Sequence, residues 1–180
     1  MSQTPTHERQ SYRLKHHNYA ETRAYHITAC SFHRQLIFSE IVDACIHLFP
    51  IGRIIDEEIR KTPLMRPNVI LDTYVVMPNH VHIILILTEA EEDAPVPRQF
   101  EAPKPGTLSS ILNGLKSACT SRVRKELGPS DAKVWQGRFY DRVIRDEDEL
   151  NRTRQYIHDN PAQWQDDHEN PINYRKLRHP

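Results

Sequence analysis

Two histidines with one residue between them, His80 and His82, lie in the segment MPNHVH at residues 77–82. They open an apolar run that ends at Leu87. Residues two apart in a strand share a face, so the two imidazoles point the same way. Two imidazoles on one face can bind one divalent cation. An isolated His-x-His pair is more often hydrogen-bonded or half-exposed than a metal site, so the interpretation needs support from elsewhere in the chain.

A second pair, Tyr156 and Asn160, is spaced four residues apart in a segment with a helical pattern. Residues i and i+4 lie on one helix face, which aligns a phenol with an amide oxygen. Together with His80 and His82, Asn160 would complete three ligands, with open positions for a substrate, and Tyr156 would be the nucleophile. A free phenol has a pKa near 10, so it needs a cation that polarises its target.

Tyr140 is the alternative nucleophile. It lies in a predicted strand beside Asp141 and Arg142, and no amide or acid follows it four residues later. Strand tyrosines usually pack or stack, so Tyr156 is preferred. His158 lies two residues after Tyr156 and is predicted to point away from the Tyr156 face, to the surface.

The elements that must position these residues follow a β-α-β-β-α-β order, and a further helix comes after them. The predicted strands span 24–32, 69–77, 80–87 and 134–144, the last with a possible break at Gly137. Pro78-Asn79 is a natural turn between the second and third strands, which we expect to pair as a hairpin. This order is typical of the α+β ferredoxin-like split βαβ fold: a four-stranded antiparallel sheet with two helices on one face. The additional C-terminal helix is expected to cover the other face.

Three helices are predicted from apolar periodicity and end signals. The first begins at Pro50 and stops at Pro63, the second is capped by Thr107 and ends before Gly128, and the third is capped by Asp146 and stops at Asn160-Pro161. Residues 36–49 remain unassigned.

Length and composition predict one domain at residues 24–164, after an N-terminal arm at 1–23 and before a C-terminal tail at 165–180. An acidic, proline-rich loop insertion at 89–106 is expected to be disordered. No run of about 18 apolar residues and no signal peptide is seen, and three widely spaced cysteines form no disulfide framework. These features favour a soluble cytoplasmic protein. A net charge of zero argues against nucleic-acid binding in general, but bases at 122–125 and 138–154 allow a local basic face.

The motifs together resemble a known family. MPNHVH followed by Tyr156-Ile157 and Asn160-Pro161 resembles the HUH endonuclease superfamily, specifically the REP-associated tyrosine transposases, and the resemblance covers nearly the whole chain. Supporting matches are Arg13-Leu14, residues 24–28, 107–116 and 140–146, Trp135, Trp164, Asp167 and Asn170-Pro171. The acidic insertion and the neutral net charge depart from the family pattern.

The resemblance implies a function. His80, His82 and Asn160 would bind Mg²⁺ or Mn²⁺, and Tyr156 would attack single-stranded DNA at or near REP-type hairpins, giving a 5′-phosphotyrosine and a free 3′-hydroxyl that can be rejoined. The chain would act as a cytoplasmic, nucleoid-associated protein, with a monomer favoured over a dimer that exchanges the Tyr156 helix. Expected DNA contacts are Arg13, Lys116, Arg138, Tyr140, Arg142, Arg145, Arg152 and Arg154.

Three alternatives stay open. The chain could bind DNA hairpins without catalysis, act as a metal-dependent phosphohydrolase that uses water, or bind RNA on a ferredoxin-like sheet. The third strand carries histidines and aliphatic residues where an RNA-binding sheet would carry stacking aromatics. The tail after Trp164 is a further candidate for controlling access to the site.

Overall fold

The computed structural model describes residues 23–88, 106–128, 133–167 and 169–173. Residues 89–105 of the insertion predicted at 89–106, residues 1–22 of the arm predicted at 1–23, including Arg13, and residues 174–180 of the tail lie outside the described residues. The elements are β1 (Arg23–Cys30), β2 (Ser39–Val42), β3 (Cys45–Leu48), α1 (Pro50–Met65), β4 (Val69–Val76), β5 (His80–Leu87), α2 (Leu108–Glu126), β6 (Tyr140–Ile144) and α3 (Glu147–Gln163), with 3-10 turns at Phe32–Arg34 and Pro171–Asn173.

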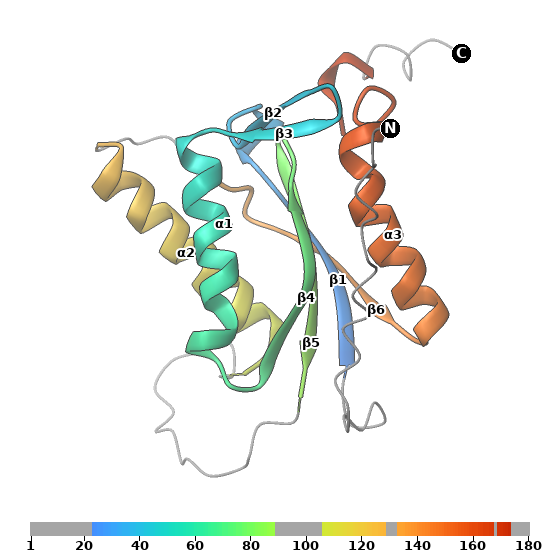
Figure 1. Ribbon diagram of the computed structural model, residues 1–180. Coiled ribbons are helices and arrows are strands. Elements are labelled where there is room, and N and C mark those ends of the chain that lie inside the picture. The colour runs from blue at the N-terminus through green and yellow to red at the C-terminus, as the bar shows by residue number, and fades with distance from the viewer. Residues whose placement is uncertain (1–22, 89–105, 129–132, 168, 174–180) are drawn as a thin grey trace, which may run out of the picture.

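The main sheet is antiparallel with strand order β4-β5-β1-β6. Helices α1 and α2 cover one face, and α3 lies on the other (Figure 1). This confirms the predicted ferredoxin-like arrangement, with the histidine-bearing strand β5 in a central position. The predicted hairpin of β4 and β5 is also confirmed, with a register shift between Leu71 and Thr73.

Side chains along β5 alternate between the two faces of the sheet, so they contribute to two separate hydrophobic cores. Val81, Ile83 and Leu85 join the core under α1 and α2, while Ile84 joins the core under α3. Both sets are almost fully buried. Val81 therefore faces away from His80 and His82, as the strand period predicts.

Residues 36–49, which sequence patterns left unassigned, contain the short hairpin of β2 and β3. Asp43 and Ala44 make its turn with positive φ angles of 50° and 60°. Such a turn usually carries glycine or asparagine, so the missing glycine explains why the hairpin gave no sequence signal.

Helix starts were predicted better than helix ends. Thr107 caps α2 by accepting from the Ser110 N–H (3.3 Å), and Asp146 caps α3 by accepting from the Glu149 N–H (2.7 Å). The predicted stops at Pro63 and Pro161 were wrong, because α1 continues to Met65 and α3 to Gln163. A proline in the last turn removes a single helical hydrogen bond, which a packed helix tolerates.

The predicted strand at 134–144 is shorter than expected. Only Tyr140–Ile144 pairs with β1 as β6. Trp135 makes an isolated bridge to Ser31, and the Gln136 N–H donates to the Cys30 carbonyl (3.0 Å). Residues 136–139 between them therefore leave the regular ladder.

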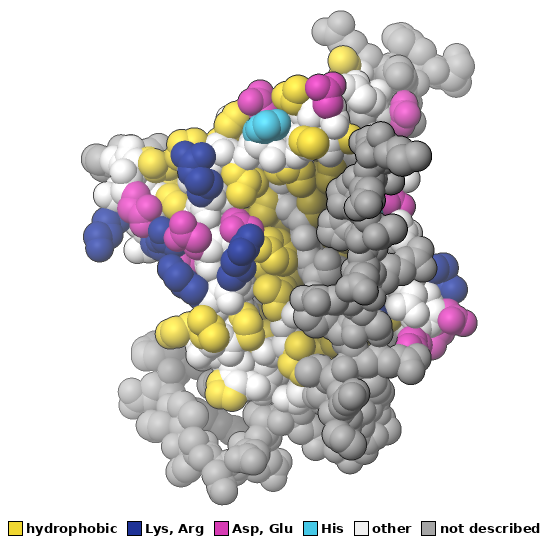
Figure 2. Space-filling view, in the orientation of Figure 1, with side chains coloured by type: hydrophobic (Ala, Val, Ile, Leu, Met, Phe, Trp, Pro, Cys, Tyr) yellow, Lys and Arg dark blue, Asp and Glu magenta, His cyan; other side chains and the backbone are white. Residues whose placement is uncertain are grey.

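Charges on the surface formed by α1 and α2 are mixed in sign. Figure 2 shows basic and acidic side chains interleaved over α1 and α2. Arg122 of α2 forms ion pairs with Glu57 (2.8 Å), Glu58 (2.9 Å) and Glu126 (2.7 Å). This part of the surface is therefore largely self-neutralised. None of the described helices is long and apolar enough to cross a membrane.

Candidate active site

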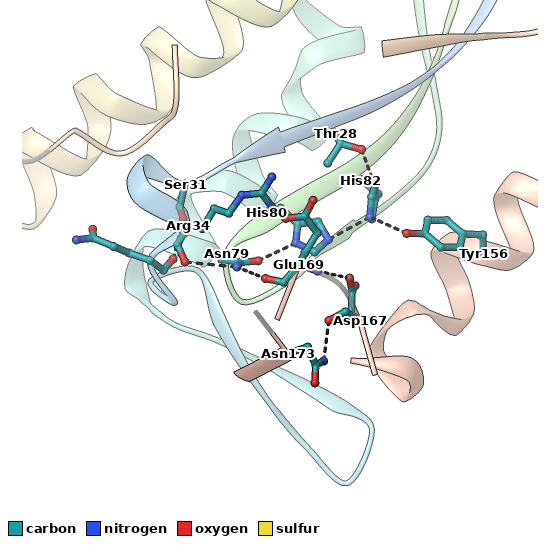
Figure 3. A network of polar contacts seen from close by, with 11 residues as sticks. Thr28, Ser31, Arg34, Asn79, His80, His82, Tyr156, Asp167, Glu169 and Asn173 are labelled. Atoms are coloured by element: carbon teal, nitrogen blue, oxygen red, sulfur yellow. Dashed lines mark hydrogen bonds and ion pairs between the residues drawn. The ribbon is translucent and has the colours of Figure 1, made fainter. Parts of the chain in front are cut away.

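His80 and His82 lie side by side on the α3 face of the sheet, and both are buried. Their Nε2 atoms are 3.0 Å apart (Figure 3). The strand period places both rings on one face, and β5 is flanked by β1 and β4, so the pair is held from both sides. The two nitrogens lie within hydrogen-bond distance of each other.

The Nδ1 atom of His80 is hydrogen-bonded to the neighbouring Asn79. The Asn79 Nδ2 donates to the Glu169 carbonyl (2.8 Å) and faces the Arg34 carbonyl (3.4 Å), so its Oδ1 faces His80 Nδ1 (2.8 Å). An amide oxygen only accepts, so the proton of neutral His80 lies on Nδ1. The lone pair of neutral His80 then lies on Nε2, the atom that faces His82 Nε2.

The Nδ1 atom of His82 contacts two side chains of β1. Thr28 Oγ1 lies 3.0 Å and His26 Nε2 lies 3.2 Å from His82 Nδ1. Thr28 pairs directly with His82 in the sheet register. Burial and, secondarily, the charge of Arg142 lower the pKa of His26, which favours its neutral form. These partners orient the imidazole as outer-shell groups orient metal ligands.

Helix α3 brings Tyr156 and Asn160 to the same place. The Tyr156 hydroxyl is 3.5 Å from His82 Nε2, and its ring meets the His82 ring edge-on. Asn160 is buried, and its Oδ1 has no hydrogen-bond partner. A buried carbonyl oxygen without a partner is costly, so this atom is a free acceptor for a ligand.

The environment of Tyr156 opposes ionisation of its phenol. Burial and, secondarily, the negative charge of Asp167 raise its pKa above the usual value of 10, while a hydrogen bond with Asn160 lowers it. The phenol is therefore protonated at neutral pH. A cation beside it would be needed to make it a good nucleophile.

These residues fit a divalent cation. Two imidazole nitrogens lie 3.0 Å apart, and Asn160, whose buried amide oxygen has no partner, lines the same cavity as Tyr156. No cluster of three or more His, Cys, Asp or Glu side chains with metal-binding geometry occurs within the described ranges. The predicted set therefore depends on Asn160 as the third donor.

Tyr140, the alternative nucleophile, lies on the edge strand β6 and is exposed. It pairs with Thr28, which pairs with His82, so all three share a row on one sheet face. Two strand spacings of roughly 4.8 Å separate Tyr140 from His82. The direct contact of Tyr156 with His82 favours Tyr156. His158 is exposed beside Asp159, pointing away as predicted.

The predicted DNA contacts are spread over the fold. Arg142 forms an ion pair with Glu149, and Arg154 with Asp72. Lys116 Nζ donates to the carbonyls of Gln136 (2.5 Å) and Gly137 (3.1 Å). Four of the predicted bases lie on exposed surface: Arg138, Arg142, Arg145 and Arg152. The side chains of Arg142, Arg154 and Lys116 thus have structural partners. Arg138, Arg142 and Arg145 lie on or beside β6, the strand that pairs with β1.

Sequence reasoning gave no role at the site to several residues that lie around the histidines: His26, Thr28, Asn79, Trp164 and Asp167. His26 and Thr28 are two apart in a predicted strand, so their shared face was visible. Their contact with His82 depends on the register between β1 and β5. The sequence pattern of one strand does not determine that register. Trp164 is buried beside His80, with ring centroids 6.1 Å apart.

Removing the Thr28 hydroxyl should weaken the orientation of His82. In Thr28→Val we expect Mn²⁺ to bind roughly tenfold more weakly, because an outer partner of a metal-bound imidazole typically contributes that much. Isothermal titration of the purified protein with Mn²⁺ would measure the change. Thr73→Val is the matched control, since Thr73 pairs with Ile84, the next residue on the same face. Equal affinity in the two variants would contradict the role given to Thr28.

Comparison with known proteins places the chain in a family. It is 34% identical over 168 residues to an uncharacterized protein of Haemophilus influenzae, covering 89% of this chain and 92% of that protein. The chain belongs to the family of that protein. No protein-family model matches the chain.

One solved structure, a REP-associated tyrosine transposase bound to a REP hairpin, has the same fold. It matches with a TM-score of 0.54 and 21% sequence identity, over 79% of this chain and 68% of that chain. At this identity the similarity establishes the fold.

Proposed function

We propose that this protein is a metal-dependent single-stranded DNA endonuclease and strand transferase of the HUH tyrosine type, acting at or near REP-type hairpins. One observation carries the proposal. The Tyr156 hydroxyl lies 3.5 Å from one of two imidazole nitrogens that converge to 3.0 Å, in a site that also buries the partnerless oxygen of Asn160. The candidate nucleophile thus lies beside one of the candidate cation ligands.

Each residue has a defined role in this proposal. His80 and His82 present lone pairs, and Asn160 presents its carbonyl oxygen, to Mg²⁺ or Mn²⁺. The bound cation would polarise the scissile phosphate and offset negative charge at the reacting oxygens. Tyr156 is held on a rigid helix, so its hydroxyl approaches the phosphate in a fixed direction.

The covalent step consumes no cofactor. The Tyr156 oxygen bonds to phosphorus while the bond from phosphorus to the 3′-oxygen breaks. The phenol loses one proton and the released 3′-oxygen gains one. The 5′-phosphotyrosine keeps the energy of the phosphodiester, so attack by another 3′-hydroxyl rejoins DNA without ATP.

The substrate class rests on shape and charge. The solved transposase with this fold is bound to a REP hairpin, and we extend that partner to this chain. The exposed bases Arg138 and Arg145 flank β6, whose Tyr140 shares the sheet face of the histidines. An exposed tyrosine suits stacking on an unpaired base. A strand that stacks on Tyr140 would therefore lie on the same sheet face as the histidines.

The complete set of site residues comes from one chain, which supports a monomer with its site in cis. Tyr156 contacts His82 of the same chain, so no exchange of α3 is required. Access to chromosomal DNA would place the protein in the cytoplasm, at the nucleoid.

A covalent adduct assay tests the proposal. Labelled single-stranded DNA carrying a REP-type hairpin would be mixed with the protein and Mn²⁺ or Mg²⁺, then run on a denaturing gel. We expect a retarded, protease-sensitive band that disappears when EDTA removes the metal. Metal-dependent cleavage without this band would instead favour water as the nucleophile. Hairpin binding without cleavage would favour the non-catalytic binding protein.

A further inference from the structure

A second cavity, of about 590 Å³, lies between α2 and the segment 133–137. We call it the basic cavity. The residues of α2 that line it recur every three or four positions, so they form one polar stripe beside the buried apolar stripe of the same helix. The members of the polar stripe are Asn113, Lys116, Ser117, Thr120, Ser121 and Arg124.

The charge of the basic cavity has one sign. Lys116, Arg124 and Lys133 line it, and its described lining contains no Asp or Glu. Lys116 donates to two backbone carbonyls, which are neutral, and burial, opposed by Cys30, lowers its pKa, as expected for a cation that lacks an anionic partner. Arg124 and Lys133 are exposed, and neither forms an ion pair within the described part of the chain. The cavity therefore favours an anionic ligand.

Trp135 gives an independent sign of a ligand. This residue lines the basic cavity and is only 7% exposed, with its ring 5.0 Å from that of Phe38. Its buried indole Nε1 has no hydrogen-bond partner among the described residues. A buried N–H without an acceptor costs free energy, so it marks a place where an acceptor is missing.

The length of the polar stripe indicates the kind of anion. Asn113 and Arg124 are eleven residues apart on α2, which corresponds to roughly 16 Å along the helix axis. A single small anion would occupy about one turn of 5.4 Å. Hydroxyl and cationic donors spread over three turns suit a chain of phosphates, such as the backbone of one DNA strand.

The basic cavity lies at the same end of the sheet as the histidines but on the opposite face. Trp135 belongs to the core under α1 and α2, whereas His80 faces α3. The Gln136 N–H donates to the Cys30 carbonyl (3.0 Å), and Cys30 pairs with His80. The chain then continues from the cavity to β6 (Figure 1).

We propose that the basic cavity binds the sugar-phosphate backbone of single-stranded DNA, as an anchoring site separate from the candidate active site. This inference rests on the proposed function for DNA as the polyanion. Contacts to phosphates hold a strand in position without reading its sequence. The site would therefore increase affinity for DNA of any sequence.

Fluorescence anisotropy of labelled oligo(dT) with the full-length protein in EDTA tests the inference without cleavage. We expect Arg124→Gln to bind about threefold more weakly and to reduce the slope of log K against log salt by about 0.7. The matched control Lys125→Gln removes the same charge from the next residue of α2, which does not line the cavity, and should weaken binding less than about twofold. Equal effects of the two substitutions would overturn the inference.

The two tryptophans of the chain report on the two sites separately. Trp135 lines the basic cavity, and Trp164 lies beside His80. In protein labelled with 5-fluorotryptophan, and with the signals assigned from Trp164→Phe, we expect oligo(dT) to shift the ¹⁹F signal of Trp135. The same DNA should leave that signal in place in Arg124→Gln/Lys133→Gln.

Two results of the ¹⁹F experiment would reject the inference. One is a Trp135 signal that does not move at saturating oligo(dT). The other is a signal that moves with inorganic phosphate and not with the oligonucleotide, which would make the ligand a small anion.

The two proposals fail in different ways. DNA binding at the basic cavity, without a metal-dependent adduct on hairpin DNA, would remove the nuclease function and keep the anchoring site. A metal-dependent adduct, with equal DNA affinity in Arg124→Gln and Lys125→Gln and an unmoved Trp135 signal, would keep the nuclease and remove the anchoring site.

Discussion

Tyr156→Phe should abolish the covalent protein–DNA adduct and lower metal-dependent cleavage at least about 10³-fold, because it removes the attacking oxygen itself. The substitution keeps the ring that packs edge-on against His82. Stability and Mn²⁺ affinity should therefore stay close to those of the natural protein. Quantifying adduct and free 3′-ended product on one denaturing gel measures both effects.

Tyr140→Phe is the matched control for this experiment. Tyr140 is exposed on β6 and lies two strands from His82, so its hydroxyl is not expected to reach the reacting phosphate. We expect normal adduct yield at saturating DNA, since the phenyl ring can still stack on a base. An adduct that persists in Tyr156→Phe and is lost in Tyr140→Phe would reverse the assignment of the nucleophile.

Gly52→Ala should destabilise the fold by about 2 kcal/mol, which for a domain of this size lowers Tm by roughly 4–8 °C. Gly52 is buried in the first turn of α1, against the backbone of Phe38. A Cβ at this position would lie 2.9 Å from the Phe38 carbonyl carbon and closer still to its oxygen. Backbone cannot yield easily, so the steric cost outweighs the ~1 kcal/mol that alanine gains in helix propensity.

Gly114→Ala is the matched control within a second helix. A Cβ at Gly114 would meet the guanidinium of Arg66, the far end of a flexible side chain. We expect unchanged or slightly raised stability, since the arginine can move and alanine favours the helix. Urea unfolding of both variants compares them directly. Equal stabilities would show that α1 can shift away from Phe38, contrary to the close packing described.

The sheet and the candidate catalytic residues were accessible from sequence for a physical reason. Strand and helix periods decide which side chains share a face, and His80/His82 and Tyr156/Asn160 follow these periods. The apolar runs on both sides of Pro78-Asn79 also predicted the central hairpin. Most of the prediction therefore depended on which side chains share a face within one strand or one helix.

Features that depend on packing between elements were not accessible. The turn at Asp43-Ala44 lacks a glycine signal, and Pro161 lies inside α3 because packing of that helix outweighs one lost hydrogen bond. The contacts of Thr28 with His82 and of Asp167 with the cavity beside Tyr156 join distant parts of the chain. The first depends on strand register and the second on the path of the chain after α3. Local sequence patterns determine neither.

Site mapping of the adduct by mass spectrometry tests the central claim most directly. After reaction with hairpin DNA and Mn²⁺, nuclease and trypsin digestion would leave a nucleotide remnant on one peptide. We predict the remnant on the peptide spanning residues 155–175, with fragment ions placing it on Tyr156 rather than Tyr174. A remnant on any other residue, or metal-dependent cleavage with no remnant at all, would contradict the proposed tyrosine mechanism.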